Sequence, residues 1–100
     1  MKNNQPICET DLFGNKSWYL NDPIINTNVV KYYQLHREDG PAIERFDGYK
    51  AWYFHDQRHR LDGPAMEFPS GEKYWYYHGK QICCDSQKEF ERLIKLRALW

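Results

Sequence analysis

The chain has 100 residues, of which 14 are Lys or Arg and 14 are Asp or Glu, so its formal net charge is zero. A chain of this length forms one domain with a thin core, because it buries only about 60 to 65% of its unfolded surface. Zero net charge excludes the long-range attraction typical of proteins that bind duplex DNA or anionic membranes, and we expect neither partner.

No stretch of the sequence reaches the roughly 20 apolar residues that a transmembrane helix needs, and the segment after Met1 is too polar for a signal peptide. We therefore expect a cytoplasmic protein. The three cysteines, Cys8, Cys83 and Cys84, lack the spacing of a zinc knuckle or a redox motif, so we interpret them as reduced thiols.

A degenerate first repeat is predicted at residues 14–34. Residues 14–19, Gly-Asn-Lys-Ser-Trp-Tyr, match the Gly-x-Lys-x-Trp-Tyr order of residues 48–53. The spacing between these copies is longer than the later repeat, and the extra residues fall in an inserted segment at 23–34. A regular repeat has no need of such an insertion, so we expect it to contribute to binding.

Two full repeats follow at residues 35–58 and 59–82. The sequence His-Arg-Glu-Asp-Gly-Pro-Ala at 36–42 recurs as His-Arg-Leu-Asp-Gly-Pro-Ala at 59–65, a shift of 23 residues (59 − 36). Further identities continue at the same shift as far as His78. Stacked repeats of this kind bury a core that no unit could bury alone.

Each repeat is predicted to be an antiparallel β-hairpin, because Asp47-Gly48 and Ser70-Gly71 supply the positive φ of a hairpin turn. Period-two alternation then separates the side chains. Ala51, Tyr53 and His55 are expected on one face with Tyr74, Tyr76 and His78, while Lys50, Trp52 and Phe54 face the other way.

A C-terminal helix is predicted over 86–100, since Ser86 and Glu89 have the spacing of a capping box and apolar residues then recur at helical spacing. The fold class is thus mainly β, with antiparallel β-hairpin repeats forming one twisted sheet that the helix caps, in a single domain over 1–100. The apolar arc of the helix is wider than one packing surface needs, so a homodimer formed through this helix is an open alternative.

The repeat resembles the MORN type (membrane occupation and recognition nexus), on the motif His-Arg-x-Asp-Gly-Pro-Ala followed by Asp-Gly-x-Lys-x-Trp-Tyr. This variant is similar to a divergent branch of small bacteriophage, large-virus and bacterial antitoxin-like proteins, and the tail at 86–96 is similar to the ending of bacteriophage members. The resemblance implies a hairpin-repeat fold, and location in the host cytoplasm if a phage encodes the chain. Asp-Gly-Pro-Ala replaces the usual Gly-x-Gly, so lipid binding is not carried over.

The repeated histidines, His36, His55, His59 and His78, are candidate metal ligands or general bases, but equivalent positions favour one local structural role used twice. Asp39 and Asp62 are expected to accept backbone N–H groups in turns, with Arg37 and Arg60 paired to nearby acids. No nucleophile with a base, phosphate loop or zinc spacing occurs in the sequence, so we expect no enzyme, no metal and no cofactor.

One layer of sheet has two faces, and a single helix cannot cover both, so one face is expected to bind a partner. Tyrosine supplies large contact area at little entropic cost. The predicted partner-binding residues are Tyr53, His55, Arg58, Arg60, Tyr74, Tyr76 and His78. The same set could instead stack a nucleotide, with Arg58 or Arg60 holding its phosphate.

Small size, a repeat scaffold and the absence of a catalytic constellation favour a non-enzymatic binding protein. The resemblance to viral members then implies that it binds and blocks a bacterial host protein, as a bacteriophage inhibitor of CRISPR or another defence system would. Two alternatives stay open. One is a sponge that sequesters a nucleotide second messenger, and the other is an antitoxin or immunity protein that binds a toxin.

Overall fold

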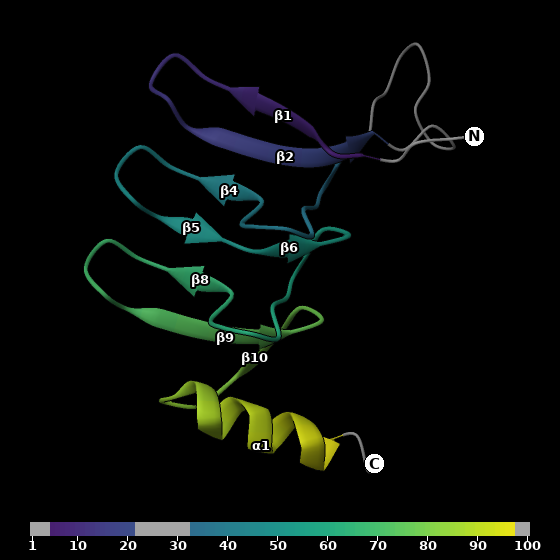
Figure 1. Ribbon diagram of the computed structural model, residues 1–100, viewed down its shortest axis with the longest axis vertical. Coiled ribbons are helices and arrows are strands. Elements are labelled where there is room, and N and C mark those ends of the chain that lie inside the picture. The colour runs from purple at the N-terminus through teal and green to yellow at the C-terminus, as the bar shows by residue number, and fades with distance from the viewer. Residues whose placement is uncertain (1–4, 22–32, 98–100) are drawn as a thin grey trace.

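The structure is a computed structural model that describes residues 5–21 and 33–97, which form short antiparallel strands and one helix (Figure 1). The elements are β1 (Ile7–Thr10), β2 (Lys16–Asn21), β3 (Tyr33–Leu35), β4 (Ile43–Glu44), β5 (Lys50–Ala51), β6 (Tyr53–Phe54), β7 (Gln57–Arg58), β8 (Met66–Glu67), β9 (Lys73–Tyr77), β10 (Lys80–Ile82) and α1 (Gln87–Arg97). The prediction of a mainly antiparallel β fold with a C-terminal helix is confirmed.

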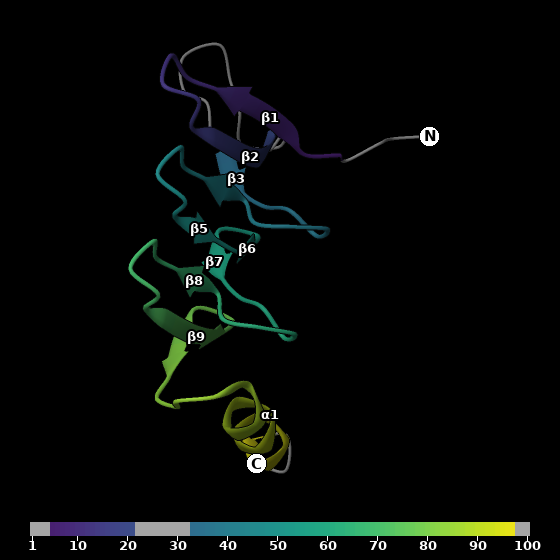
Figure 2. The same ribbon diagram turned by 60° about the vertical axis from the view of Figure 1, so that its left-hand side comes forward.

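The strands form one eight-stranded antiparallel sheet in the order β1-β2-β4-β5-β8-β9-β10, with β3 also paired to β2. β6 and β7 form a separate two-stranded sheet, so the predicted single sheet is wrong in this detail. The hairpins stack one beyond another, and α1 lies past the last hairpin at the end of the stack (Figures 1 and 2). The helix packs against this last hairpin, where Phe90 forms a buried cluster with Trp75 and Ile82.

The first turn of each unit is a three-residue loop that ends in glycine. The N–H of Gly48 donates to the carbonyl of Arg45, and the N–H of Gly71 donates to that of Phe68. These glycines have φ of 101° and 99°, as a type I turn followed by a left-handed residue requires. The sequence located the glycines correctly, but Asp47 keeps a negative φ and the loop is longer than the expected dipeptide.

A second turn in each unit was not predicted. His55 and Asp56 have φ of 50° and 68°, and His78 and Gly79 have φ of 48° and 85°. Two successive residues with positive φ are typical of a two-residue type I′ hairpin loop. The chain therefore reverses again in each unit, and an additional strand follows, β7 in one unit and β10 in the next.

An arginine of each His-Arg-x-Asp-Gly-Pro-Ala motif stacks on a tryptophan of the preceding unit. The guanidinium carbon of Arg37 lies 3.8 Å from the ring centroid of Trp18, and that of Arg60 lies 3.8 Å from the ring centroid of Trp52. A planar guanidinium gains both cation–π attraction and flat contact from this arrangement. The stacks thus join successive units.

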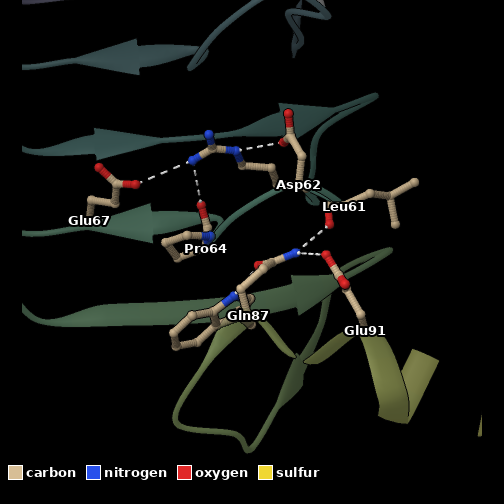
Figure 3. A network of polar contacts seen from close by, with 8 residues as sticks. Leu61, Asp62, Pro64, Glu67, Gln87 and Glu91 are labelled. Atoms are coloured by element: carbon tan, nitrogen blue, oxygen red, sulfur yellow. Dashed lines mark hydrogen bonds and ion pairs between the residues drawn. The ribbon is translucent and has the colours of Figure 1, made fainter. Parts of the chain in front are cut away.

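Three acceptors hold each stacked arginine. Arg60 donates through Nε to Asp62 at 2.9 Å, and through Nη1 to the Pro64 carbonyl at 3.1 Å and Glu67 at 3.3 Å (Figure 3). Arg37 makes the equivalent bonds at 3.0, 3.1 and 3.1 Å. The expected pairing of arginines with nearby acids is confirmed, but the motif aspartates bind arginine Nε where backbone N–H groups were expected.

Small residues of the motif leave room for the guanidinium. A Cβ added to Gly63 would lie 2.6 Å from Cζ of Arg60, closer than side chains approach one another. The motif alanines, Ala42 and Ala65, are completely buried. The motif glycine is therefore explained by the arginine, and the motif alanines by tight packing.

The tryptophan of the last repeat, Trp75, is held by the helix. At the repeat spacing of 23 residues, the position equivalent to Arg60 is occupied by Cys83. A thiol cannot stack on the Trp75 ring as a guanidinium would. The indole N–H of Trp75 donates instead to Oε1 of Gln87 at 2.8 Å, and Nε2 of Gln87 donates to the Leu61 carbonyl at 2.9 Å (Figure 3). Gln87 therefore ties the final unit to the helix.

The helix begins at its predicted N-cap and closes a small core. The Oγ of Ser86 accepts the N–H of Glu89 at 3.2 Å. The Glu89 carboxylate binds Arg92 at 2.7 Å, so it does not complete a capping box. The buried core at this end consists of Trp75, Ile82 and Phe90.

Part of two predicted segments lies outside the described residues. Of the predicted insertion at 23–34, only the last two residues are described, and they belong to β3. The predicted helix at 86–100 is described as far as Arg97. Within the described ranges, no helix has the length and apolar character needed to cross a membrane.

The arginine stack predicts a large effect of a charge-conserving substitution. Arg60→Lys keeps the charge but loses the planar contact with Trp52 and the Nε bond to Asp62, so it should lower the free energy of unfolding by about 1–3 kcal/mol. Arg92→Lys on the exposed helix surface is the matched control and should leave the free energy of unfolding nearly unchanged. Urea denaturation measures both, and equal effects would contradict a structural role for the stack.

Candidate functional site

Cross-strand register places alternating charges on one face of the sheet, which we call the charged face. The facing residues, in order across the sheet, are Lys16, Glu44, Lys50, Glu67 and Lys73. Arg37 and Arg60 bind two of these acids, Glu44 and Glu67. Because opposite charges lie side by side, this face largely compensates its own charge.

The other side of the sheet carries what we call the tyrosine face, made of Arg45, Tyr49, Tyr53, Arg58, Tyr74 and Tyr76. Phe68 connects its two ends, since its ring centroid lies 4.9 Å from that of Tyr49 and 5.8 Å from that of Tyr74. The guanidinium of Arg45 lies 5.2 Å from the Tyr49 ring. The tyrosines are half-buried, so each keeps part of its surface open to a partner.

Arg58 lies between two tyrosine rings at the centre of this face. Its guanidinium carbon is 5.6 Å from the ring centroid of Tyr53 and 5.3 Å from that of Tyr76. The register explains the arrangement, because Tyr53 is the cross-strand partner of Arg58. The Arg58 carbonyl accepts the N–H of Gly79, which brings Tyr76 of the next strand alongside.

The guanidinium of Arg58 is not satisfied by the described part of the chain. Its Nε is buried without a hydrogen-bond partner, while its terminal nitrogens stay accessible. Within residues 5–21 and 33–97, no acid forms an ion pair with it, although Arg37 and Arg60 each bind two. A buried donor without a partner costs about 1–3 kcal/mol, and more when the group is charged. Among the described residues, Nε of Arg58 is thus the buried side-chain polar atom that lacks a partner.

The phenol groups of the tyrosine face are also available. Burial raises the pKa of Tyr49, and the nearby Tyr53 raises it further, so this phenol remains a protonated donor at neutral pH. No described residue forms a hydrogen bond with the hydroxyl of Tyr49, Tyr53, Tyr74 or Tyr76. Together with the guanidinium of Arg58, these hydroxyls make the face rich in unused hydrogen-bond donors.

Four of the seven predicted binding residues lie on this face, namely Tyr53, Arg58, Tyr74 and Tyr76. Tyr49 and Arg45 also lie on this face but were not among the predicted binding residues. Tyr49 could have been found by extending the alternation back from Tyr53, because positions 49, 51 and 53 share a face. Arg45 required the hairpin register, in which its N–H donates to the Tyr49 carbonyl.

The other three predicted residues lie elsewhere. Arg60 is part of a tryptophan stack near the charged face. His55 and His78 occupy the second turns, where positive φ breaks the strand alternation that had placed them beside the tyrosines. They contact other histidines, so the prediction that they share the tyrosine face is wrong.

The histidines form two equivalent pairs that support the second turns. The N–H of His55 donates to Nδ1 of His36 at 2.9 Å, and the N–H of His78 donates to Nδ1 of His59 at 2.8 Å. The paired rings lie 4.5 and 4.2 Å apart between centroids. Each acceptor nitrogen must be unprotonated in order to accept this bond. The two pairs thus have the same local structural role, as the repeat spacing indicated.

A hollow of about 580 Å³ lies between the two motif loops, with Trp52, Phe54 and His59 among its lining residues. Its acids are already engaged by the chain. Asp39 and Asp62 bind arginines, and Glu38 lies 3.4 Å from Nε2 of His36. The hollow therefore has no arginine left for an outside acid, in contrast to Arg58 of the tyrosine face.

Within residues 5–21 and 33–97, no three His, Cys, Asp or Glu side chains gather closely enough to hold a metal ion. Comparison with known proteins identifies no relative, because no family model, no curated protein and no solved structure matches the chain.

The histidine pairs predict a loss of stability in mild acid. Burial, with a further contribution from His78, lowers the pKa of His59, so the unfolded chain binds the proton more readily than the folded one. Stability should be full above the unfolded pKa of about 6.5 and should decrease as the pH falls below it, by at most about 1.4 kcal/mol per pH unit for one histidine.

Urea denaturation between about pH 7 and pH 5 measures this slope, above the range in which ordinary carboxylates titrate. The His59→Asn variant should show a smaller slope than the wild type, because it removes this proton-binding site. An identical slope in both proteins would contradict the assignment to His59.

Proposed function

We propose that this chain is a non-enzymatic binding protein that uses the tyrosine face to dock on another protein. The observation that carries the proposal is an aromatic face, centred on Tyr53, Arg58 and Tyr76, whose side chains stay partly exposed among the described residues. Protein-binding hot spots are enriched in tyrosine and arginine, because both combine large contact area with directional hydrogen bonds.

The use of the other polar residues supports a binding role. Arg37, Arg60, His36 and His59 are engaged in contacts that join the units or hold their turns. Asp39 and Asp62 are engaged by the same arginines. The tyrosine face differs, because Arg58 has no ion-pair partner among the described residues and its Nε has no hydrogen-bond partner there.

For the kind of target, the proposal depends on the resemblance of the motif to divergent MORN-like repeats of small bacteriophage and antitoxin-like proteins. The target is accordingly a bacterial protein, and binding blocks it, as an inhibitor of CRISPR or another host defence component would. An antitoxin or immunity protein would use the same face and differ in the identity of its target.

Affinity purification from bacterial lysate tests the proposal. The tagged wild-type chain should retain a specific protein, and a Tyr53→Ala, Tyr76→Ala double variant should retain at least about tenfold less, since two hot-spot residues at about 2 kcal/mol each exceed that factor. Mass spectrometry identifies and quantifies the retained protein. Circular dichroism confirms that the variant is folded.

Leu96→Ala is the matched control, because Leu96 is an exposed apolar residue of α1, with 43% of its surface accessible. It should retain the target as the wild type does. If Leu96→Ala loses the target and the tyrosine double variant keeps it, the interface lies on the helix and not on the tyrosine face. An empty wild-type lane, together with a thermal shift by a nucleotide second messenger, would contradict protein binding and favour a nucleotide sponge.

A further inference from the structure

The positions equivalent to 58 in the other units show which residue types the fold accepts there. Leu35, Arg58 and Gln81 are the cross-strand partners of the tyrosine that follows each tryptophan, and they are spaced 23 residues apart (58 − 35 and 81 − 58). The scaffold thus accepts an apolar residue and a neutral amide at this position. An arginine at position 58 is not needed for the strand pairing.

The geometry of Arg58 defines what it can bind. Its Nε is enclosed and only its terminal nitrogens are accessible, so a partner must approach the guanidinium end-on between Tyr53 and Tyr76. A carboxylate fits this approach, because its two oxygens accept two parallel N–H bonds from a guanidinium. The flanking phenols can donate further bonds to the same group or to a neighbouring carbonyl.

We propose that the tyrosine face binds an acidic segment of its protein partner, with one Asp or Glu carboxylate of that segment seated end-on against Arg58. The inference rests on the proposed function and specifies the chemistry of the partner. Charge complementarity supports it, since neither Arg45 nor Arg58 forms an ion pair within the described residues. The hydroxyl donors of the face equally require an acceptor-rich partner.

An acidic protein segment fits this face better than a nucleic acid. A nucleic-acid strand presents a phosphate at every nucleotide and is normally bound along a continuous basic groove. The tyrosine face has two unpaired guanidiniums, and its strands also carry Asp47 and Glu72 at the hairpin tips. Two separate cations suit a few carboxylates of a protein surface.

Titration of the full chain with a decaglutamate peptide, followed by NMR, tests the inference. The side-chain N–H signals of Arg58 and the ring signals of Tyr53 and Tyr76 should shift together and saturate. Arg58→Gln, which installs the residue of the next unit, should weaken binding by about tenfold, the effect of losing one charge-assisted contact. Arg92→Gln removes the same charge from the helix and should leave the affinity unchanged.

Three results would overturn the inference: no shift at Arg58, equal weakening by Arg58→Gln and Arg92→Gln, or tighter binding of cyclic di-GMP than of decaglutamate at the same signals. Failure here is distinct from failure of the proposed function. If the lysate target is retained by Arg58→Gln but lost by the tyrosine double variant, the face binds protein without the acidic contact. If no protein is captured by the wild type, the proposed function itself fails.

Discussion

The stacking of a motif arginine on the tryptophan of the preceding unit is the interaction on which the rest of the structure depends. A single layer of short hairpins has no enclosed core, so neighbouring units must be joined by contacts across the layer. Arg60 joins them by its contact with Trp52, its two acidic partners and its bond to the Pro64 carbonyl. Gln87 provides the corresponding link for the last unit, where no further motif arginine follows.

This arrangement separates stability from binding on the two sides of the sheet. The arginines that stack on tryptophan are fully engaged, and the charges around them alternate and compensate one another. Arg58 has the opposite character, because it is half-buried, flanked by tyrosines and without an acidic partner in the described chain. The same residue type therefore serves the fold at position 60 and, in our proposal, the partner at position 58.

The sequence contained enough information for the fold class, the hairpin glycines and four residues of the tyrosine face. The repeat spacing located equivalent positions, and period-two alternation grouped Tyr53 with Tyr76. It failed at His55 and His78, because left-handed backbone at a histidine has no clear signal in the sequence. Gly79 was the one available indication of a second turn, and it lies between strand residues.

The stack of Arg60 on Trp52 could not be predicted from the sequence either, since it joins residues of different units through a three-dimensional contact. The predicted ion pairs were correct because Arg60 and Asp62 are close along the chain. The unsatisfied Nε of Arg58 could not be foreseen, because an arginine in a strand usually reaches solvent or an acid.

The most direct test of the central claim is the free energy of unfolding of an Arg58→Leu variant, measured by urea denaturation beside the wild type. Leucine occupies the equivalent position 35, and the substitution removes a buried donor that has no partner. The account predicts that the variant is more stable than the wild type by about 0.5–2 kcal/mol, as expected where a binding residue is retained at the expense of stability. A variant less stable than the wild type by about 1 kcal/mol or more would show that Arg58 serves the fold, and it would contradict the separation of roles between the two sides of the sheet.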